Sequence, residues 1–206
     1  MTTPTVDHIL LQHAVEVLRQ GGLVAYPTDT VYGLAAVPTN ADAMARLFEA
    51  KKRNPDQPVP LLIASLKEAA AVAADVPDVA KRLMREFWRG ALTIILPKAI
   101  TFQSAAVGET VGLRVPDHPV PRDLARLLGG LITGTSANIA GGPEPLTAED
   151  VRAQLGDSVE LVIDGGRCAG GQPSTVVDCS MAPPRVVREG AISRTALERA
   201  AGTTLL

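Results

Sequence analysis

Four short polar clusters lie at residues 28–32, 51–53, 133–138 and 174–175; the second ends a predicted helix, and the other three stand next to apolar runs that predict strands. They bring together hydroxyl, amide and basic side chains. Ligands of open α/β sheets usually bind at the ends of strands. Hydroxyls, backbone amides and guanidinium groups suit anions, phosphates and amino-acid head groups. The four clusters together therefore predict a site for ligands of these kinds.

The first cluster interrupts the segment LVAYPTDTVYGLAA, residues 23–36. Its opening apolar residues predict a buried strand, which Pro27 ends because proline cannot donate a hydrogen bond to a neighbouring strand. Two threonines, an aspartate and a tyrosine follow before the chain becomes apolar again. They could form a hydrogen-bonded turn, or they could present polar groups to a ligand at the end of the strand.

The second cluster, Lys51, Lys52 and Arg53, ends a predicted helix just before a proline-containing loop. These cations could interact favourably with the helix C-terminus. In an extended or turning segment, however, residues i and i+2 project to the same side. Lys51 and Arg53 would then face one anion, and Lys52 would point away from it.

Arg114 is a further candidate, because it interrupts the apolar strand VGLRV at residues 111–115. A charge in such a strand needs a protein partner or a ligand. Asp29 and Asp164 are the candidate protein partners, and an anionic ligand is the alternative.

The remaining clusters also allow structural interpretations. Ser136 and Asn138 could shape a turn, and Ser174 could simply begin a strand. The sequence contains no GxxxxGK[ST] segment and no GxGxxG segment after a strand, so neither a P-loop nor a Rossmann nucleotide site is supported. The three histidines and two cysteines lack metal-ligand spacing. His13 is predicted to lie on the face of a helix. His118 is predicted to have a structural or surface role.

Composition narrows the class of protein. The chain has 206 residues, of which 46% are hydrophobic and 20% charged, as is typical of a globular fold. A net charge of −2 excludes a global basic field for nucleic acid but not a local basic groove. No apolar run approaches the roughly 20 residues of a membrane span, and the N-terminus lacks signal-peptide features. We therefore expect a cytoplasmic protein that does not enter a membrane.

Helical and strand patterns are mixed along the chain, with short connections and no repeat. This mixture predicts an α/β domain built on a twisted sheet, mixed rather than wholly parallel, with flanking helices. No linker divides the chain, so we expect a single domain over residues 1–206. The expected helices run from residue 6 to 18, from 40 to 48, from 65, from 77 to 88, from 121 to 128, from 147 to 156 and from 193; the expected strands cover 23–26, 59–64, 92–96, 111–115, 131–133, 160–164, 174–178 and 185–188.

Eight segments, in the same order, resemble the YrdC-like threonylcarbamoyl-AMP synthases. They are YPTDTVYGLAA (26–36), KKR (51–53), PVPLLI (58–63), FWRGALTIIL (87–96), GLRVP (112–116), TSANIAGGP (135–143), PSTVVD (173–178) and VVREGAI (186–192). The resemblance covers about residues 10–195. It implies a twisted α/β sheet with a large concave, locally positive cavity. It also implies synthesis of L-threonylcarbamoyl-AMP and pyrophosphate from L-threonine, bicarbonate and ATP.

The resemblance also assigns roles to individual residues. It implies Mg²⁺ accompanying ATP, no tightly bound protein-ligated metal, and a downstream transferase complex that modifies tRNA beside the anticodon. Leu62 stands where some members carry a histidine near threonine, and Glu144 where some carry a serine that contacts the nucleotide. The implied threonine-binding residues are Thr30, Tyr32, Arg114, Gly134 and Ser174; the implied ATP-binding residues are Arg53, Gln57, Val111, Ser136, Asn138 and Arg188; and Lys51 and Arg53 are the implied catalytic residues.

Two other functions remain open. A non-catalytic RNA-binding module could use the same basic cavity, and threonine-dependent ATP turnover would separate the two hypotheses. A carbamoyl-phosphate-using domain, like the related one in hydrogenase maturation, usually comes joined to acylphosphatase and zinc-finger-like domains. This sequence shows neither of those domains.

Overall fold

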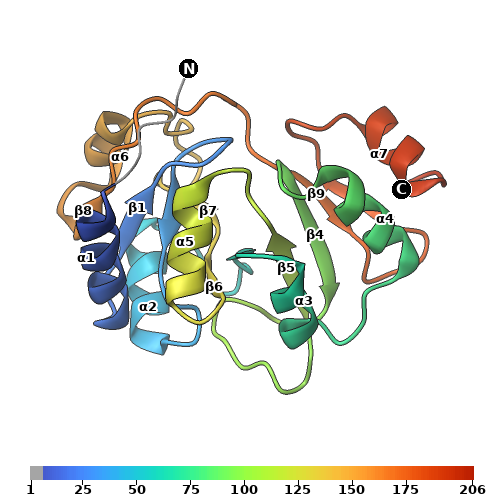
Figure 1. The fold of residues 1–206 in the computed structure, drawn as a ribbon, viewed down its shortest axis with the longest axis horizontal. Coiled ribbons are helices and arrows are strands. Elements are labelled where there is room, and N and C mark those ends of the chain that lie inside the picture. The colour runs from blue at the N-terminus through green and yellow to red at the C-terminus, as the bar shows by residue number, and fades with distance from the viewer. Residues whose placement is uncertain (1–6) are drawn as a thin grey trace.

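The structure, a computed structural model, describes residues 7–206, and these residues form two mixed β-sheets with flanking helices (Figure 1). The α/β class and the mixed pairing of strands are confirmed, and the strands divide into two sheets. The strands of the smaller sheet lie in the order β7 (Thr135–Ser136), β2 (Gly33–Ala35), β1 (Val24–Tyr26), β8 (Leu161–Val162). The strands of the larger sheet lie in the order β10 (Arg185–Arg188), β9 (Thr175–Asp178), β4 (Leu92–Pro97), β5 (Thr110–Arg114), β3 (Leu61–Ile63), β6 (Leu131–Thr133).

The polar segment after β1 lies inside the smaller sheet and connects its two central strands. It reverses the chain, so that β2 pairs antiparallel with β1. The sheets meet at Thr133, which ends β6 in the larger sheet. The Thr133 hydroxyl donates to the carbonyl of Leu34 and accepts from the amide of Ala36, both at 2.8 Å. Only Gly134 separates β6 from β7 in the smaller sheet.

Helices cover both sheets. In Figure 1 the smaller sheet lies among α1, α2 and α6, and the larger sheet among α3, α4 and α7. Helix α5 packs on β3 and β6 of the larger sheet and against α1. Their bounds are α1 (His8–Arg19), α2 (Ala41–Ala50), α3 (Leu66–Val72), α4 (Asp78–Phe87), α5 (Pro119–Leu127), α6 (Ala148–Leu155), the 3-10 turn η1 (Gly156–Ser158) and α7 (Arg194–Ala201). No helix of the described residues is both long and apolar enough to span a membrane.

The predicted helix boundaries hold to within a few residues because side chains cap them. Asn40 caps α2, and Ser65 and Thr147 form capping boxes at α3 and α6. His118 accepts a hydrogen bond from the amide of Val120 at the start of α5, which confirms a structural role for this histidine. His13 lies exposed on α1, as predicted; Val6, expected in the same helix, lies outside the described residues.

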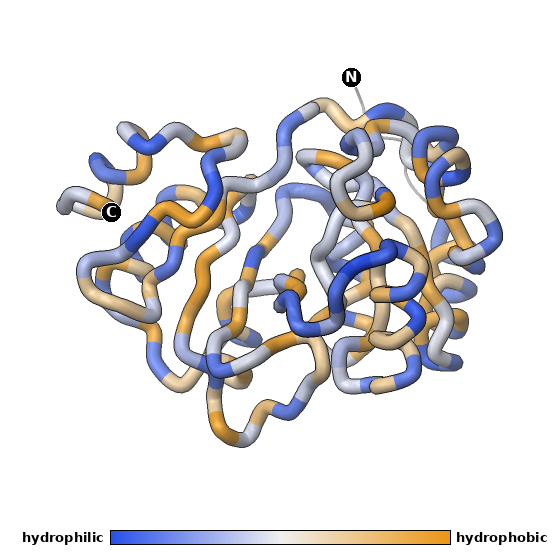
Figure 2. Tube along the Cα trace, turned by 180° about the vertical axis from the view of Figure 1, so that it is seen from behind, coloured by the Kyte–Doolittle hydropathy of each residue, from blue (hydrophilic) through white to orange (hydrophobic). Residues whose placement is uncertain are grey.

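Two hydrophobic clusters hold the sheets and helices together. The larger cluster packs strands of both sheets against α2, α4, α6 and α7. The smaller one packs α1 and α5 over β1 and β6, with Leu18, Leu124 and Ile132 fully buried. Hydrophobic and hydrophilic residues alternate along the helices at the surface (Figure 2). Strands β2 and β7 were not predicted, because each is only two or three residues long and adjoins polar turn residues.

Candidate functional site

A cavity of about 560 Å³ is lined by residues from both sheets. Residues of four predicted polar clusters reach it, although they are far apart in the sequence. Ten of the twelve predicted site residues line the cavity: Thr30, Lys51, Arg53, Gln57, Arg114, Gly134, Ser136, Asn138, Ser174 and Arg188. Tyr32 and Val111 do not.

Thr30 lies in a hydrogen-bonded turn, and the contacts of Thr28 determine which hydroxyl of the turn donates and which accepts. The Thr28 hydroxyl donates to the carbonyl of Val31 at 2.6 Å and accepts from the amide of Thr30 at 3.0 Å. Because the Thr28 proton is already used, the Thr30 hydroxyl must be the donor in the 2.9 Å bond between the two hydroxyls. The turn interpretation is thus confirmed, and the same turn leaves Thr30 at the cavity as an acceptor.

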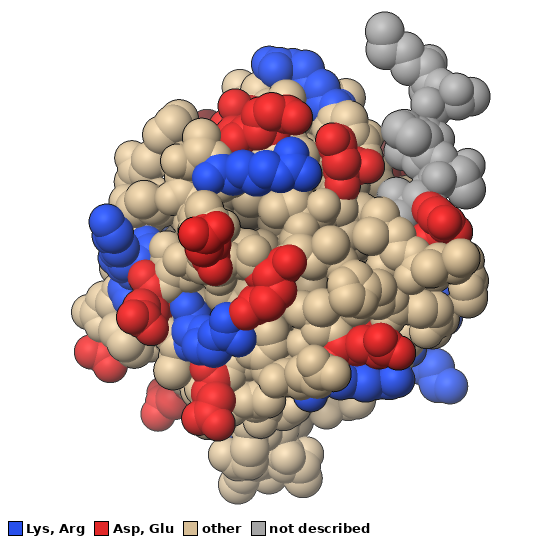
Figure 3. Space-filling model, turned by 90° about the vertical axis from the view of Figure 1, so that its left-hand side faces the viewer, with Lys and Arg blue, Asp and Glu red and all other residues tan. Residues whose placement is uncertain are grey.

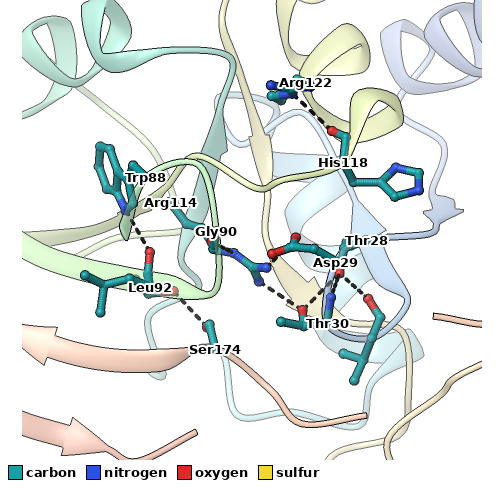
Figure 4. Close-up of polar contacts among 12 residues, drawn as sticks. Thr28, Asp29, Thr30, Trp88, Gly90, Leu92, Arg114, His118, Arg122 and Ser174 are labelled. Carbon is teal, nitrogen blue, oxygen red and sulfur yellow. Dashed lines mark hydrogen bonds and ion pairs between the residues drawn. The ribbon is translucent and has the colours of Figure 1, made fainter. Parts of the chain in front are cut away.

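Arg114 is buried at the end of β5 and is held on several sides (Figure 4). Its Nε donates to the carbonyl of Gly90 at 2.9 Å. One Nη donates to the Thr30 hydroxyl at 3.1 Å, and the other donates to Asp29 at 2.6 Å. Of the two candidate protein partners, Asp29 is therefore the one that pairs with Arg114. We call Arg114, Asp29 and Thr30 the Arg114 subsite.

Ser174 lies at the cavity and hydrogen-bonds to Arg188, a second cation of the cavity. Its hydroxyl shares a 2.9 Å hydrogen bond with that of Thr93. Arg188 donates to the Ser174 carbonyl at 2.8 Å and more weakly to its hydroxyl at 3.3 Å. Burial lowers the pKa of Arg188, and the charge of Arg114 lowers it further, whereas that of Glu144 raises it. Thr93 is a cavity residue that the sequence analysis missed, although a threonine within the apolar run LTIIL was a signal for it.

Lys51 is buried, and its ammonium is directed at the protein rather than at open space. It donates to the carbonyls of Ser136 and Asn138, at 2.5 and 2.7 Å, and to the Asn138 side chain at 3.3 Å. Burial, together with the nearby charge of Arg53, lowers its pKa to about 8. Because all three ammonium protons have acceptors, Lys51 holds the 136–138 segment at the cavity. Its predicted contact with an anion stays a prediction.

Arg53, by contrast, has an unused donor in the cavity. One Nη donates to the carbonyl of Pro58 at 2.8 Å, but its buried Nε has no partner among the described residues. Burial lowers its pKa, with a further contribution from the charge of Arg188. The Oε2 atom of Glu144 is likewise buried without a partner in residues 7–206. We call Arg53, Arg188 and Glu144 the Arg53 subsite.

The backbone separates Lys52 from its two neighbours. Lys51 keeps helical dihedrals at the end of α2, whereas Lys52 has a positive φ of 50° and an exposed side chain. Lys52 does not line the cavity that Lys51 and Arg53 share. The predicted separation is therefore confirmed, although a left-handed residue causes it and not an extended segment.

Tyr32 and Val111 have other surroundings. The hydroxyl of Tyr32 donates to the carbonyl of Gly166 at 2.8 Å and accepts from the amide of Gly165 at 3.1 Å, and burial raises its pKa to about 12. It braces the 164–166 loop, so its side chain does not line the cavity, although the resemblance names Tyr32 among the threonine-binding residues. Val111 is fully buried. Side chains alternate along β5, so Thr110 and Gly112 face the cavity in its place.

The described residues contain no group of three or more His, Cys, Asp or Glu side chains placed to hold a metal ion. The cavity instead offers hydroxyls, guanidinium groups and one unpaired carboxylate oxygen. Residues 16–190 match the pattern of the Sua5–YciO–YrdC family, which is described as "Telomere recombination". The chain belongs to this family.

Several members of the Sua5–YciO–YrdC family are named for an activity. The chain is 39% identical to a threonylcarbamoyl-AMP synthase of Bacillus subtilis over 93% of its own length, but it spans only 56% of that relative. It is 35% identical to a threonylcarbamoyl-AMP synthase of Vibrio cholerae, with 87% of this chain and 97% of the relative covered.

Solved structures of the family agree with this fold. Sua5 of Pyrococcus abyssi in complex with L-threonine superimposes with a TM-score of 0.93 at 35% identity, covering 98% of this chain and 60% of that one. HypF superimposes with a TM-score of 0.77 at only 20% identity, over 29% of its length. The likeness to HypF therefore shows a shared fold and nothing about the substrate.

Proposed function

We propose that the chain is an L-threonylcarbamoyl-AMP synthase that uses L-threonine, bicarbonate and ATP. The observation that carries the proposal is one cavity with two different groups of residues. The Arg114 subsite and Ser174 suit a small hydroxylated amino acid, whereas the Arg53 subsite suits phosphates. Family relatives with the name of this activity, and a relative solved with L-threonine, support the assignment.

The proposed reaction has two steps. The amine of threonine attacks the carbon of bicarbonate, and water leaves, which gives the N-carboxylate, a carbamate. An oxygen of this carbamate attacks the α-phosphorus of ATP, and the bond to the leaving pyrophosphate breaks. Threonylcarbamoyl-AMP and pyrophosphate are the products, and no covalent intermediate with the protein is required.

The protein contributes mainly position and charge. Arg114 would bind the threonine carboxylate through the two Nη protons that protein acceptors do not use. Thr30 would accept from a donor group of threonine, and Ser174, which directly precedes β9, would also hydrogen-bond it. Arg53 and Arg188 would hold the phosphates. Lys51 would keep the 136–138 segment, with Ser136 and Asn138, in place against the nucleotide.

Mg²⁺ fits this cavity as a companion of ATP. The unpaired Oε2 of Glu144 offers the kind of oxygen that Mg²⁺ takes when it binds mainly through phosphates. When bound, the ion would neutralise charge on the phosphates and on the leaving pyrophosphate. We also propose that a downstream tRNA-modifying transferase complex uses the product and that the activity is cytoplasmic.

The test is incubation of the chain with ATP, bicarbonate and labelled threonine, followed by detection of the labelled adenylate and of pyrophosphate. Product that depends on all three substrates supports the proposal. Leucine in place of threonine is the matched control and should give none. If no product forms with any amino acid, but the chain binds RNA through the cavity cations, the RNA-binding hypothesis replaces this one. Acids and bases alternate on the face shown in Figure 3, so that face presents no basic patch for RNA.

A further inference from the structure

Arg114 and Asp29 form the most deeply buried ion pair within residues 7–206. Their side chains are 7% and 16% exposed, whereas each of the other ion pairs there has a partner at least 37% exposed. Arg114 lines the cavity, but Asp29 does not. Asp29 therefore acts on a bound ligand through its charge and through Arg114, and not by direct contact.

The ion pair changes the net charge that a ligand encounters at Arg114. An arginine keeps its positive charge in proteins, and the Asp29 carboxylate lies 2.6 Å from its Nη. The pair as a whole carries no net charge. A ligand carboxylate that reaches Arg114 is attracted by the guanidinium and repelled by Asp29. A ligand that also carries an ammonium group recovers attraction from Asp29, and a simple anion does not.

Other groups near the pair do not replace Asp29. His118 is within reach of the Asp29 charge, but burial lowers the pKa of this histidine and favours its neutral form. Burial raises the pKa of Cys168, so that this thiol is also neutral. The charge of Arg188 reaches Arg114, but this guanidinium is held on Ser174. Arg188 adds positive charge and so cannot balance Arg114.

We propose that Asp29 is a specificity-determining residue that keeps the Arg114 subsite electrically neutral. The subsite thereby favours a zwitterionic amino acid over a carboxylate of the same shape that lacks the amine. This inference rests on the proposed function, which assigns the amino-acid carboxylate to Arg114. It goes further by naming a residue that selects the charge state of the substrate without touching it.

The experiment compares two ligands by calorimetry in the absence of ATP. One is L-threonine, and the other is the matching 2,3-dihydroxybutanoate, in which a hydroxyl replaces the amine. The wild-type chain should bind threonine about tenfold or more tightly than the anion. In Asp29→Asn, which keeps an acceptor for Arg114 but removes the charge, this ratio should fall about tenfold. The fall should come from tighter binding of the anion, since one unit charge at several ångströms is worth at least this much near a protein surface.

Asp117→Asn is the matched control, because Asp117 is an exposed acid just after β5 and should leave the ratio unchanged. An unchanged ratio in a folded Asp29→Asn overturns the inference. If Asp29→Asn does not fold, the wild-type chain still decides, since equal binding of the two ligands overturns the inference as well. If the wild-type chain binds neither ligand, the proposed function fails, a result distinct from loss of selectivity alone.

Discussion

The two subsites of the cavity differ in how completely their polar groups are paired. In the Arg114 subsite, Arg114 has three protein acceptors, one of which is the anionic Asp29, and Thr30 is also hydrogen-bonded to the neighbouring Thr28. In the Arg53 subsite, the Nε of Arg53 and the Oε2 of Glu144 lack partners among the described residues. A paired, neutral subsite is ready for a ligand of low net charge. An unpaired, cationic subsite is costly until a polyanion enters it.

This difference predicts where catalytic charge stabilisation resides. Arg53→Ala removes a desolvated cation from the proposed phosphate site, where charge would develop, so it should act mainly on kcat. By comparison with other preorganised donors, we expect a fall of roughly 10²–10³-fold. The measurement is pyrophosphate release that depends on threonine and bicarbonate, with folding checked by circular dichroism. Lys52→Ala is the internal control, because its side chain is exposed outside the cavity. Equal activity of the two variants would falsify the assignment of Arg53.

Removal of Arg114 should affect binding more than chemistry. Arg114→Ala should raise the KM for threonine by about 10- to 100-fold, because the carboxylate loses its positioned partner, and should change the KM for ATP much less. It should also lower the melting temperature, since Asp29 is left buried without a cation. A large loss of melting temperature with unchanged threonine dependence would show that the ion pair is only structural. Arg114→Lys should not restore the KM, because lysine cannot reproduce the several directed contacts of the guanidinium.

Lys51 supplies a prediction about stability, because it belongs to neither subsite but holds the segment between them. Its folded pKa of about 8 lies below its unfolded value, so the charged form is disfavoured in the fold. This cost is present below about pH 8 and disappears as the pH rises toward the unfolded value of about 10.4. Over that window the free energy of unfolding should rise by about 2 kcal/mol relative to Lys51→Met. Denaturant melts at pH 7.5 and 10 measure the difference.

Lys52→Met is the control for these melts, since an exposed lysine should give the same pH dependence as the wild-type chain. Other groups that titrate in this range, such as the tyrosines, are common to all three proteins and cancel in the comparison. A parallel pH dependence for the wild-type chain and Lys51→Met would mean that the Lys51 ammonium is not desolvated as its contacts indicate.

The sequence predicted the separate elements and most of the site, but not the way in which they pair. Capping residues such as Asn40 and Ser65 are local signals, so the helix starts could be predicted. The division into two sheets depends on pairing between β1 and β2 and on Thr133, whose hydroxyl links segments about a hundred residues apart. Such long-range pairing leaves little trace in a single sequence. The motifs identified most cavity residues, but not where each side chain points.

Three residues show this limit directly. Tyr32 and Val111 stand within the right motifs, but one braces a loop and the other alternates away from the cavity on β5. Lys51 lies at the cavity, but its protons are used by the 136–138 segment. These outcomes depend on which acceptors the fold brings within hydrogen-bonding distance. Spacing along the chain does not determine that distance.

Thr93 gives the smallest expected effect and tests how far pairing matters within the amino-acid side of the cavity. Its hydroxyl is buried and shares a 2.9 Å hydrogen bond with that of Ser174, a residue proposed to bind threonine. Thr93→Val keeps the shape of the side chain and removes one neutral hydrogen bond, worth about 0.5–1.5 kcal/mol. The KM for threonine should therefore rise only about threefold to tenfold, with kcat and the KM for ATP nearly unchanged. Thr110→Val, on the neighbouring strand β5 at the same cavity, is the matched control. If both variants raise the KM for threonine equally, the effect comes from general loss of polarity in the cavity; if neither does, Ser174 keeps its position without Thr93.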